Sequence, residues 1–227
     1  FTLNQNSAVA PSIPSPPSQP DHSEDGERKL VSVVFADISG FTALSEKLDP
    51  EKVTDLMNAC FDRLGKVVFK YEGFIDKFMG DCIMALFGAP TAHENDPELA
   101  LRCALGLIRE LELFNLETGN NLRMSIGINS GMVIAGNVGT ERKREYTVMG
   151  DAVNTAQRLQ SIAKPGQILV SREIFKFCEK QFDFNLLSSV QMKGKEEAVE
   201  VFEVIGEQTR KADQDEKTFK LKSFIGR

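Results

Sequence analysis

The sequence has little of the material from which many metal sites and catalytic triads are built, because its 227 residues include two histidines and four cysteines. The cysteines are widely scattered, at Cys60, Cys82, Cys103 and Cys178. This spacing fits neither a zinc site nor a disulfide framework, so we expect buried apolar thiols in a reducing cytosol. His22 and His93 lie in polar stretches and are expected at the surface. Histidine-based metal or triad chemistry is therefore disfavoured.

A surplus of basic residues and a long hydrophobic run are also missing. The formal net charge is −6, whereas nucleic-acid binding requires a basic surface. No apolar stretch approaches the length of a membrane span. The hydrophobic fraction of 41% and the charged fraction of 26% are ordinary for a soluble globular protein. We expect a cytoplasmic domain that contacts neither nucleic acid nor membrane.

The composition divides the chain into three parts. Residues 1–28 are rich in proline and serine and predict a disordered linker. Residues 29–206 carry the periodic apolar patterns of a folded domain, and residues 207–227 turn polar and charged, as a second linker would. Because the chain begins at Phe1, we expect a fragment of a longer protein. Its last four residues resemble the opening of an ATPase module, which suggests a downstream ATPase or regulatory domain.

Hydrophobic periodicity within the central part predicts alternating strands and helices. Helices are expected over residues 50–71, 96–113, 152–162 and 171–178. Strands are expected over residues 30–38, 122–130, 132–138, 146–149, 168–170, 182–187 and 199–205, with a hairpin over 74–87. Gly131 is predicted to make a turn between two of these strands. The order favours an α+β sandwich with helices packed on a mostly antiparallel sheet.

Two aspartates interrupt apolar strand patterns. Asp37 follows the run Val33–Ala36 and precedes a Ser-Gly turn, and Asp81 lies at the Gly-Asp corner of the predicted hairpin. An aspartate in a buried strand is costly unless something pairs with it. Two such carboxylates near Lys77, in a chain poor in histidine, favour hard-cation chemistry on a phosphate substrate. The alternative is that Asp37 caps a turn and Asp81 is an ordinary corner residue.

Three motifs together resemble the class III nucleotidyl cyclases. Residues 35–42 have the sequence FADISGFT, residues 77–81 KFMGD, and residues 146–159 YTVMGDAVNTAQRL. The motifs stand in family order, and the resemblance spans about residues 29–206. It implies a ferredoxin-like α+β sandwich that forms a head-to-tail homodimer with two composite sites. The implied activity is that of an adenylyl cyclase, which converts ATP to 3′,5′-cyclic AMP and pyrophosphate.

The resemblance also implies how the site holds metal and phosphate. Two divalent cations per site, Mg²⁺ or Mn²⁺, would be bound by Asp37 and Asp81, with Ile38 as a further metal position. The turn formed by Gly40, Phe41 and Thr42 would offer backbone N–H groups to phosphate oxygens.

Basic residues farther along the chain match family positions that contact the β- and γ-phosphates. These are Arg142 and Lys193. The register is open, because Lys143, Arg144 and Lys195 lie close by, and a simple surface charge cluster is the alternative.

The remaining matched positions would recognise the base and stabilise the transition state. Lys77 and Thr147 correspond to the family's adenine-reading pair, although each alone is an ordinary strand residue. Asn154 and Arg158 lie four residues apart and so share one helix face. In the family they position the ribose and stabilise the transition state, whereas a plain polar helix face is the alternative.

Two further aspartates are left out of the predicted site. Asp76 alternates with Lys77 and is therefore expected on the other side of its strand. Asp151 is expected to cap the helix that follows it.

Competing hypotheses come from the same fold. A guanylyl cyclase is disfavoured by Lys77, and a diguanylate cyclase by the absence of a Gly-Gly-[Asp/Glu]-Glu-Phe signature. A non-catalytic, cyclase-like domain that only dimerises and regulates a neighbour is the third hypothesis. Such domains typically lose the metal aspartates or the arginine, and this chain retains all three.

Overall fold

The computed structural model describes residues 26–40, 49–140, 143–187 and 199–208. The strands are β1 (Glu27–Ser39), β2 (Phe74–Met79), β3 (Cys82–Phe87), β4 (Arg123–Thr140), β5 (Lys143–Met149), β6 (Ile168–Ser171), β7 (Phe182–Leu186) and β8 (Val201–Glu207). The helices are α2 (Pro50–Lys70), α3 (Asp96–Thr118), α4 (Asp151–Ile162) and α5 (Arg172–Cys178). Helix α3 continues five residues beyond its predicted end, until Gly119 closes it in the left-handed conformation.

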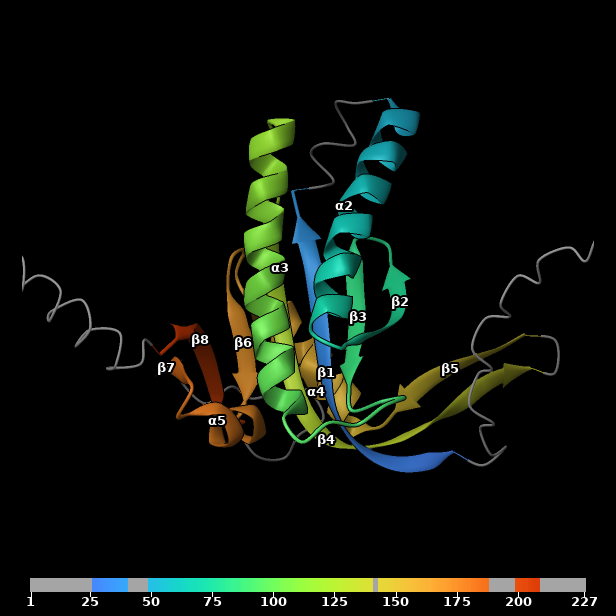
Figure 1. Cartoon of the computed structure of the whole chain (residues 1–227), viewed down its shortest axis with the longest axis vertical. Helices are drawn as coiled ribbons and strands as arrows, with labels where there is room; N and C mark the ends of the chain where they lie inside the picture. Colours follow the sequence, from blue (N-terminus) through green and yellow to red (C-terminus); the bar gives the residue numbers. More distant parts are fainter. Residues whose placement is uncertain (1–25, 41–48, 141–142, 188–198, 209–227) are drawn as a thin grey trace, which may run out of the picture.

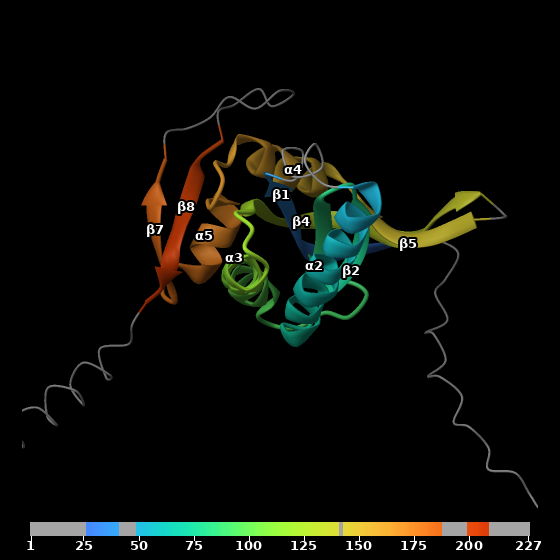
Figure 2. The same ribbon diagram turned by 90° about the horizontal axis from the view of Figure 1, so that it is seen from above.

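The described strands form one sheet in the order β2-β3-β1-β4-β6-β8-β7, with β5 paired to β4. Every pair is antiparallel except β4 with β6. Helices α2 and α3 lie on one face of the sheet and α4 lies on the other (Figures 1 and 2). The prediction of an α+β fold with a mostly antiparallel sheet is confirmed.

The alternation of side chains along β1 sorts the core into two layers. Ala36 and Ile38 join the cluster beneath α2 and α3, whereas Val33 and Phe35 join the cluster on the α4 side. Because side chains alternate along a strand, Asp37 falls on the α4 side. The first carboxylate of the predicted site thus lies on the face opposite the long helices.

The prediction of a turn at Gly131 is wrong. Strand β4 runs without interruption from Arg123 to Thr140, and Gly131 pairs with Val31 of β1. A Cβ at Gly131 would lie 2.9 Å from the Cβ of Ala152. The glycine is therefore explained by close packing of α4 on the strand, which a turn-based interpretation of the sequence missed.

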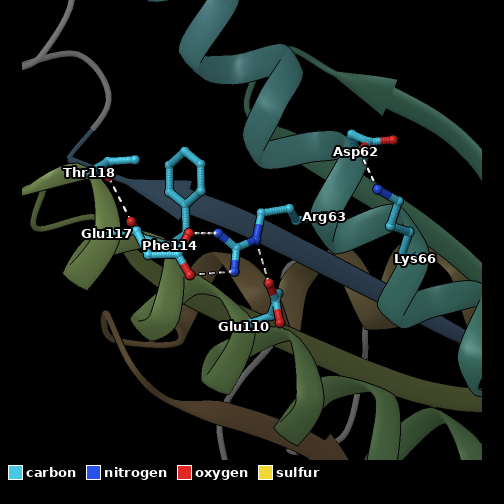
Figure 3. Close-up of polar contacts among 7 residues, drawn as sticks. All are labelled: Asp62, Arg63, Lys66, Glu110, Phe114, Glu117 and Thr118. Carbon is cyan, nitrogen blue, oxygen red and sulfur yellow. Dashed lines mark hydrogen bonds and ion pairs between the residues drawn. The ribbon is translucent and has the colours of Figure 1, made fainter.

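Helices α2 and α3 are joined by a guanidinium that bridges two carboxylates (Figure 3). Arg63 Nε donates to Glu110 Oε1 at 2.5 Å, and its Nη1 and Nη2 donate to the carboxylate of Glu117 at 2.5 and 3.2 Å. The guanidinium also lies 5.7 Å from the ring centroid of Phe114. The hydrogen bonds from Arg63 hold the pKa of Glu117 below its usual value. This fork-like contact sets the position of α2, whose N-terminal half lies beside the β2–β3 turn.

All four cysteines are buried with free thiols, as predicted. Burial raises the pKa of Cys82 and of Cys178 to about 12, which leaves these thiols protonated and unreactive. In the described ranges, no helix is both long enough and apolar enough to cross a membrane.

We expect Gly127→Ala to destabilise the domain strongly. A Cβ at this position of β4 would lie 2.1 Å from the backbone nitrogen of Gln160 and 2.3 Å from the carbonyl oxygen of Ala156, both in α4. Because backbone atoms cannot swing aside, α4 must shift, at a cost of about 3 kcal/mol. Urea denaturation of the purified variant measures the loss.

The matched control for this substitution is Gly206→Ala in β8. A Cβ there would meet nothing within 4 Å. The free energy of unfolding of this variant should stay close to the wild-type value. If both variants unfold at the same urea concentration as wild type, the tight contact between β4 and α4 is not present in solution.

Candidate active site

Asp37 and Asp81 lie at neighbouring points where β1 meets the β2–β3 hairpin. The backbone N–H of Ile38 donates to the carbonyl oxygen of Asp81 at 3.1 Å, and Asp37 stands opposite Cys82 in the β1–β3 ladder. Both aspartates are half-buried, whereas the side chain of Ile38 is fully buried. The strand pairing therefore brings together two carboxylates that are 44 positions apart in the sequence, and neither is sealed in the hydrophobic interior.

The two carboxylates act on each other electrostatically. Burial raises the pKa of Asp37, and the charge of Asp81 raises it further. Within the described residues, no group of three or more histidine, cysteine, aspartate or glutamate side chains is arranged to hold a metal. Two carboxylates with open positions still suit Mg²⁺, which keeps several water or phosphate ligands. A divalent cation between them would remove the repulsion that raises the pKa of Asp37.

The predicted phosphate-binding residues are largely outside the described part of the chain. Gly40 follows β1 and has φ +95°, a conformation that favours glycine and supports a turn at this point. Phe41, Thr42, Arg142 and Lys193 lie outside the described residues, so their roles stay predictions.

Lys77 lies on β2, and its neighbourhood differs from the prediction at one residue. The β2–β3 register shifts between Ile75 and Lys77, which leaves Asp76 in a β-bulge. Strict alternation therefore fails, and the exclusion of Asp76 on that ground was wrong. Lys77 Nζ lies 3.1 Å from Asp76 Oδ2. No sequence pattern marks a bulge of this kind, because it depends on how two strands pair.

Thr147 lies on β5, is 9% exposed, and pairs with Gly136. Two observations connect its strand to β2. The rings of Phe74 and Tyr146 meet edge to face with centroids 6.0 Å apart. The pKa of Glu145 is lowered chiefly by Lys143 and to a smaller extent by Lys77. Glu145 and Thr147 are two residues apart and therefore share a face of β5.

Asn154 and Arg158 both lie on α4, as predicted. Asn154 is exposed and Arg158 is half-buried. The Nη1 atom of Arg158 is buried, and among the described residues it has no hydrogen-bond partner. A buried guanidinium nitrogen without an acceptor lowers the stability of the fold, unless a ligand or another chain accepts its hydrogen bond. In the described ranges, no hydrogen bond or ion pair links Arg158 to either aspartate.

The N-terminus of α4 corrects one prediction. Gly150, not Asp151, is the N-cap residue, and it makes no side-chain capping bond, since it has no side chain. Asp151 is already the first helical residue. The helix is tied to the sheet instead by Asn129, whose Nδ2 donates to the carbonyl oxygen of Ala152 at 2.9 Å.

Two cavities differ in their relation to these residues. One of about 440 Å³ lies between α2 and the hairpin turn, and Asp81 lines it together with Thr54 and Asn58. A larger one of about 640 Å³ includes Leu30 and His93 in its lining, and none of the predicted site residues that the structure describes lines it. No sequence pattern predicts the smaller cavity, because its walls come from two elements that meet only in the folded chain.

Comparison with known sequences and structures identifies the family to which the chain is related. The family model for the adenylate and guanylate cyclase catalytic domain matches residues 24–206. Adenylate cyclase 1 of Rhizobium meliloti is 35% identical over 185 residues, which cover 79% of this chain and 28% of that protein. The chain thus spans less than a third of this curated relative.

Two solved structures superpose closely on the domain. The adenylyl cyclase CyaB from P. aeruginosa has a TM-score of 0.79 at 32% identity, covering 82% of this chain and 98% of that one. The guanylyl cyclase Cya2 has a TM-score of 0.78 at 35% identity, covering 82% and 96%. With the family model matching most of its length, the chain belongs to the family of adenylate and guanylate cyclase catalytic domains.

Proposed function

We propose that this domain is an adenylyl cyclase that converts ATP to 3′,5′-cyclic AMP and pyrophosphate. The observation that carries the proposal is the adjacency of Asp37 and Asp81, fixed by the hydrogen bond between Ile38 and Asp81. The 3′-oxygen of the ribose forms a bond to the α-phosphorus, and the bond from that phosphorus to the pyrophosphate oxygen breaks. The proton of the 3′-hydroxyl passes to water or to the substrate. Positioning and electrostatics supply the catalysis.

The metal set is proposed as two Mg²⁺ or Mn²⁺ ions per site, bound by Asp37 and Asp81. Ile38 would contribute its backbone carbonyl, because its side chain is apolar and fully buried. When bound, such ions lower the pKa of an attacking hydroxyl and neutralise charge on a phosphate leaving group.

The residues of α4 and β5 would act on the rest of the nucleotide. Arg158 would direct its guanidinium at the negative charge that spreads over the pentacoordinate α-phosphate, and its unpartnered Nη1 supports this role. Asn154, one turn earlier and exposed, would hold the ribose.

We propose that the site is completed by a second copy of the chain in a head-to-tail homodimer. One protomer would supply Asp37 and Asp81, and its partner the base-reading residues together with Asn154 and Arg158. The absence of any link between Arg158 and the aspartates within the described part of one chain supports this arrangement. We also place the reaction in the cytoplasm, where ATP is available and free thiols stay reduced.

The direct test is product formation by the purified domain. With ATP and either Mn²⁺ or Mg²⁺, chromatography should show cyclic AMP and pyrophosphate in equal amounts. If dimeric protein forms no cyclic nucleotide with either metal, the enzyme proposal fails and the non-catalytic regulatory hypothesis replaces it.

A guanylyl cyclase is the second candidate, favoured by the 35% identity with Cya2. Lys77 and Thr147 argue for adenine, because a buried site whose donors and acceptors match one base leaves them unpaired with the other. Competition between ATP and GTP in one reaction decides between the two candidates.

We expect the double substitution Lys77→Glu, Thr147→Cys to move the preference toward GTP. Glutamate replaces a donor with an acceptor, which suits the N–H groups of guanine. The ratio of kcat/KM for ATP over GTP should fall by about 100-fold, as expected when a site matched to one partner meets another. The control is the double substitution Lys66→Glu, Thr118→Cys at two exposed residues of α2 and α3. It should leave the ratio unchanged. An unaltered ratio in the Lys77, Thr147 variant would refute these residues as base readers.

A further inference from the structure

Asp76 is a buried carboxylate for which the site described above has no use. Its side chain has 0% exposure. Neither of its oxygens has a hydrogen-bond partner among the described residues. A buried carboxylate normally accepts several hydrogen bonds, and without them its charge is costly. In this state the carboxylate is weak evidence of a role in the stability of the fold.

The bulge in β2 determines where this carboxylate lies. Ile75 pairs with Ala85, and the next paired residue is Lys77, opposite Met84. Asp76 is therefore the extra residue between two ladder positions. Ile75 packs against the core under α2, whereas Met84 belongs to the core on the α4 side. A bulge re-aims the side chains around it, and here it places Asp76 and Lys77 within contact of each other.

The ammonium of Lys77 is the one cation in contact with Asp76 within the described residues. Nζ lies 3.1 Å from Oδ2, but the direction of approach is not that of a hydrogen bond. The side chain of Lys77 is 38% exposed, whereas the side chain of Asp76 is fully buried. The next carboxylate, Glu145, is 60% exposed and is bound by Lys143 at 3.0 Å. Asp76 is thus the carboxylate that contacts Lys77 among the described residues.

We propose that Asp76 is a positioning residue that holds the Lys77 ammonium in place for selecting adenine over guanine. The inference rests on the proposed function, since Lys77 must read the base. An ammonium has three donors and no acceptor. Adenine offers an acceptor at N1, where guanine has an N–H, but guanine offers an acceptor at O6. A lysine free to move would satisfy either base, whereas one tethered to a buried carboxylate reaches one position.

The test is the substitution Asp76→Asn, which keeps the shape of the side chain and removes its charge. We expect the ratio of kcat/KM for ATP over GTP to fall about tenfold, because loss of a charged contact at this distance changes an equilibrium by about that factor. The fall should come more from a higher KM for ATP than from a lower kcat. The control is Asp62→Asn on α2, which removes a carboxylate that is 65% exposed and 2.6 Å from Lys66. The control should leave the ratio unchanged.

A second set of variants separates positioning from a general effect on the fold. If Asp76 acts through Lys77, adding Asp76→Asn to Lys77→Ala should change the ratio no further. Asp76→Leu fills the same buried space without charge and should alter the selectivity as Asp76→Asn does. It keeps the test decisive if the Asp76→Asn protein folds poorly. Thermal unfolding is measured alongside, because a purely structural role would lower the melting temperature and spare the ratio.

The outcomes distinguish this inference from the proposed function. If Lys77→Ala alters the ATP over GTP ratio and neither Asp76 variant does, the inference is overturned and the function stands. Additive effects of the Asp76 and Lys77 substitutions would overturn it as well. If wild-type protein makes no cyclic nucleotide, or Lys77→Ala leaves the ratio unchanged, the base-reading role fails first and the inference falls with it.

Discussion

The substitution Asp37→Asn should abolish cyclic nucleotide formation, with kcat reduced at least about 1000-fold. Loss of one carboxylate from the pair removes several kcal/mol of metal-based stabilisation of the transition state, and each 1.36 kcal/mol is a factor of ten in rate. Steady-state assays with Mg²⁺ and with Mn²⁺ measure the loss. Asp183→Asn, at an exposed strand aspartate of β7, is the matched control and should retain full activity.

The same variant should be more stable than wild type when no divalent cation is present. The pKa of Asp37 is raised by burial and by Asp81, so the unfolded chain gives up this proton more readily than the folded one. Above the folded-state pKa the ionised carboxylate therefore destabilises the fold, and the penalty disappears as the pH falls from that value to the unfolded-state pKa. Asparagine avoids the penalty at neutral pH.

Thermal unfolding with and without metal checks both statements. Added Mg²⁺ should raise the melting temperature of wild type, because it binds only the folded state, and should leave Asp37→Asn nearly unchanged. A variant that is inactive but still stabilised by Mg²⁺ would place the metal elsewhere. A variant that retains wild-type activity would refute the whole assignment of the site.

Mixing Asp37→Asn with Arg158→Ala should restore activity that neither protein has alone. In a head-to-tail dimer, one site of each heterodimer combines an intact pair of aspartates with an intact arginine, and the other site carries both defects. Random assortment makes half of the dimers heterodimers, so about one quarter of the wild-type activity should return. Co-expression of the two chains with different affinity tags isolates the heterodimer for assay.

The control for this experiment pairs Asp37→Asn with Asp81→Asn. Both defects then lie in the set of residues that one chain contributes, so neither site of the heterodimer is intact and no activity should return. Equal recovery in the two mixtures would contradict the separation of aspartates and arginine between protomers. Absence of recovery with Arg158→Ala, in proteins shown to be dimers, would contradict it too.

Most of the elements around the site could be predicted from local sequence. Apolar spacing located α2, and Asp49 confirms its start by accepting a hydrogen bond from the N–H of Glu51 at 3.0 Å. The hairpin between β2 and β3 turns at Gly80, which has φ +64°, as the Gly-Asp pair indicated. These features depend on residues close in the chain, so their signal is contained in short windows.

Three predictions about single residues are wrong, and at Gly131 and Asp76 the reason is contact between two elements. The predicted turn at Gly131 is absent, and the small size of this residue serves the packing of Ala152 of α4 on β4. The alternation rule that predicts Asp76 on the other side of its strand holds only in an unbroken ladder, and the β2–β3 register shifts at this residue. Asp151 was expected to cap α4, yet Gly150 occupies that position.

The identity of the proposed reacting groups can be predicted from the amino-acid sequence, because carboxylates, an arginine and a lysine in recognisable motifs define what chemistry is available. Which of these groups lie together depends on how the strands pair in the folded chain. Antiparallel pairing of β1 with β3 carries Asp37 to Asp81, and a bulge in β2 sets a buried charge against Lys77. The proximity of Asp37 and Asp81 arises from long-range strand pairing, whose energy is spread over the whole sheet and leaves no mark in a short window of residues.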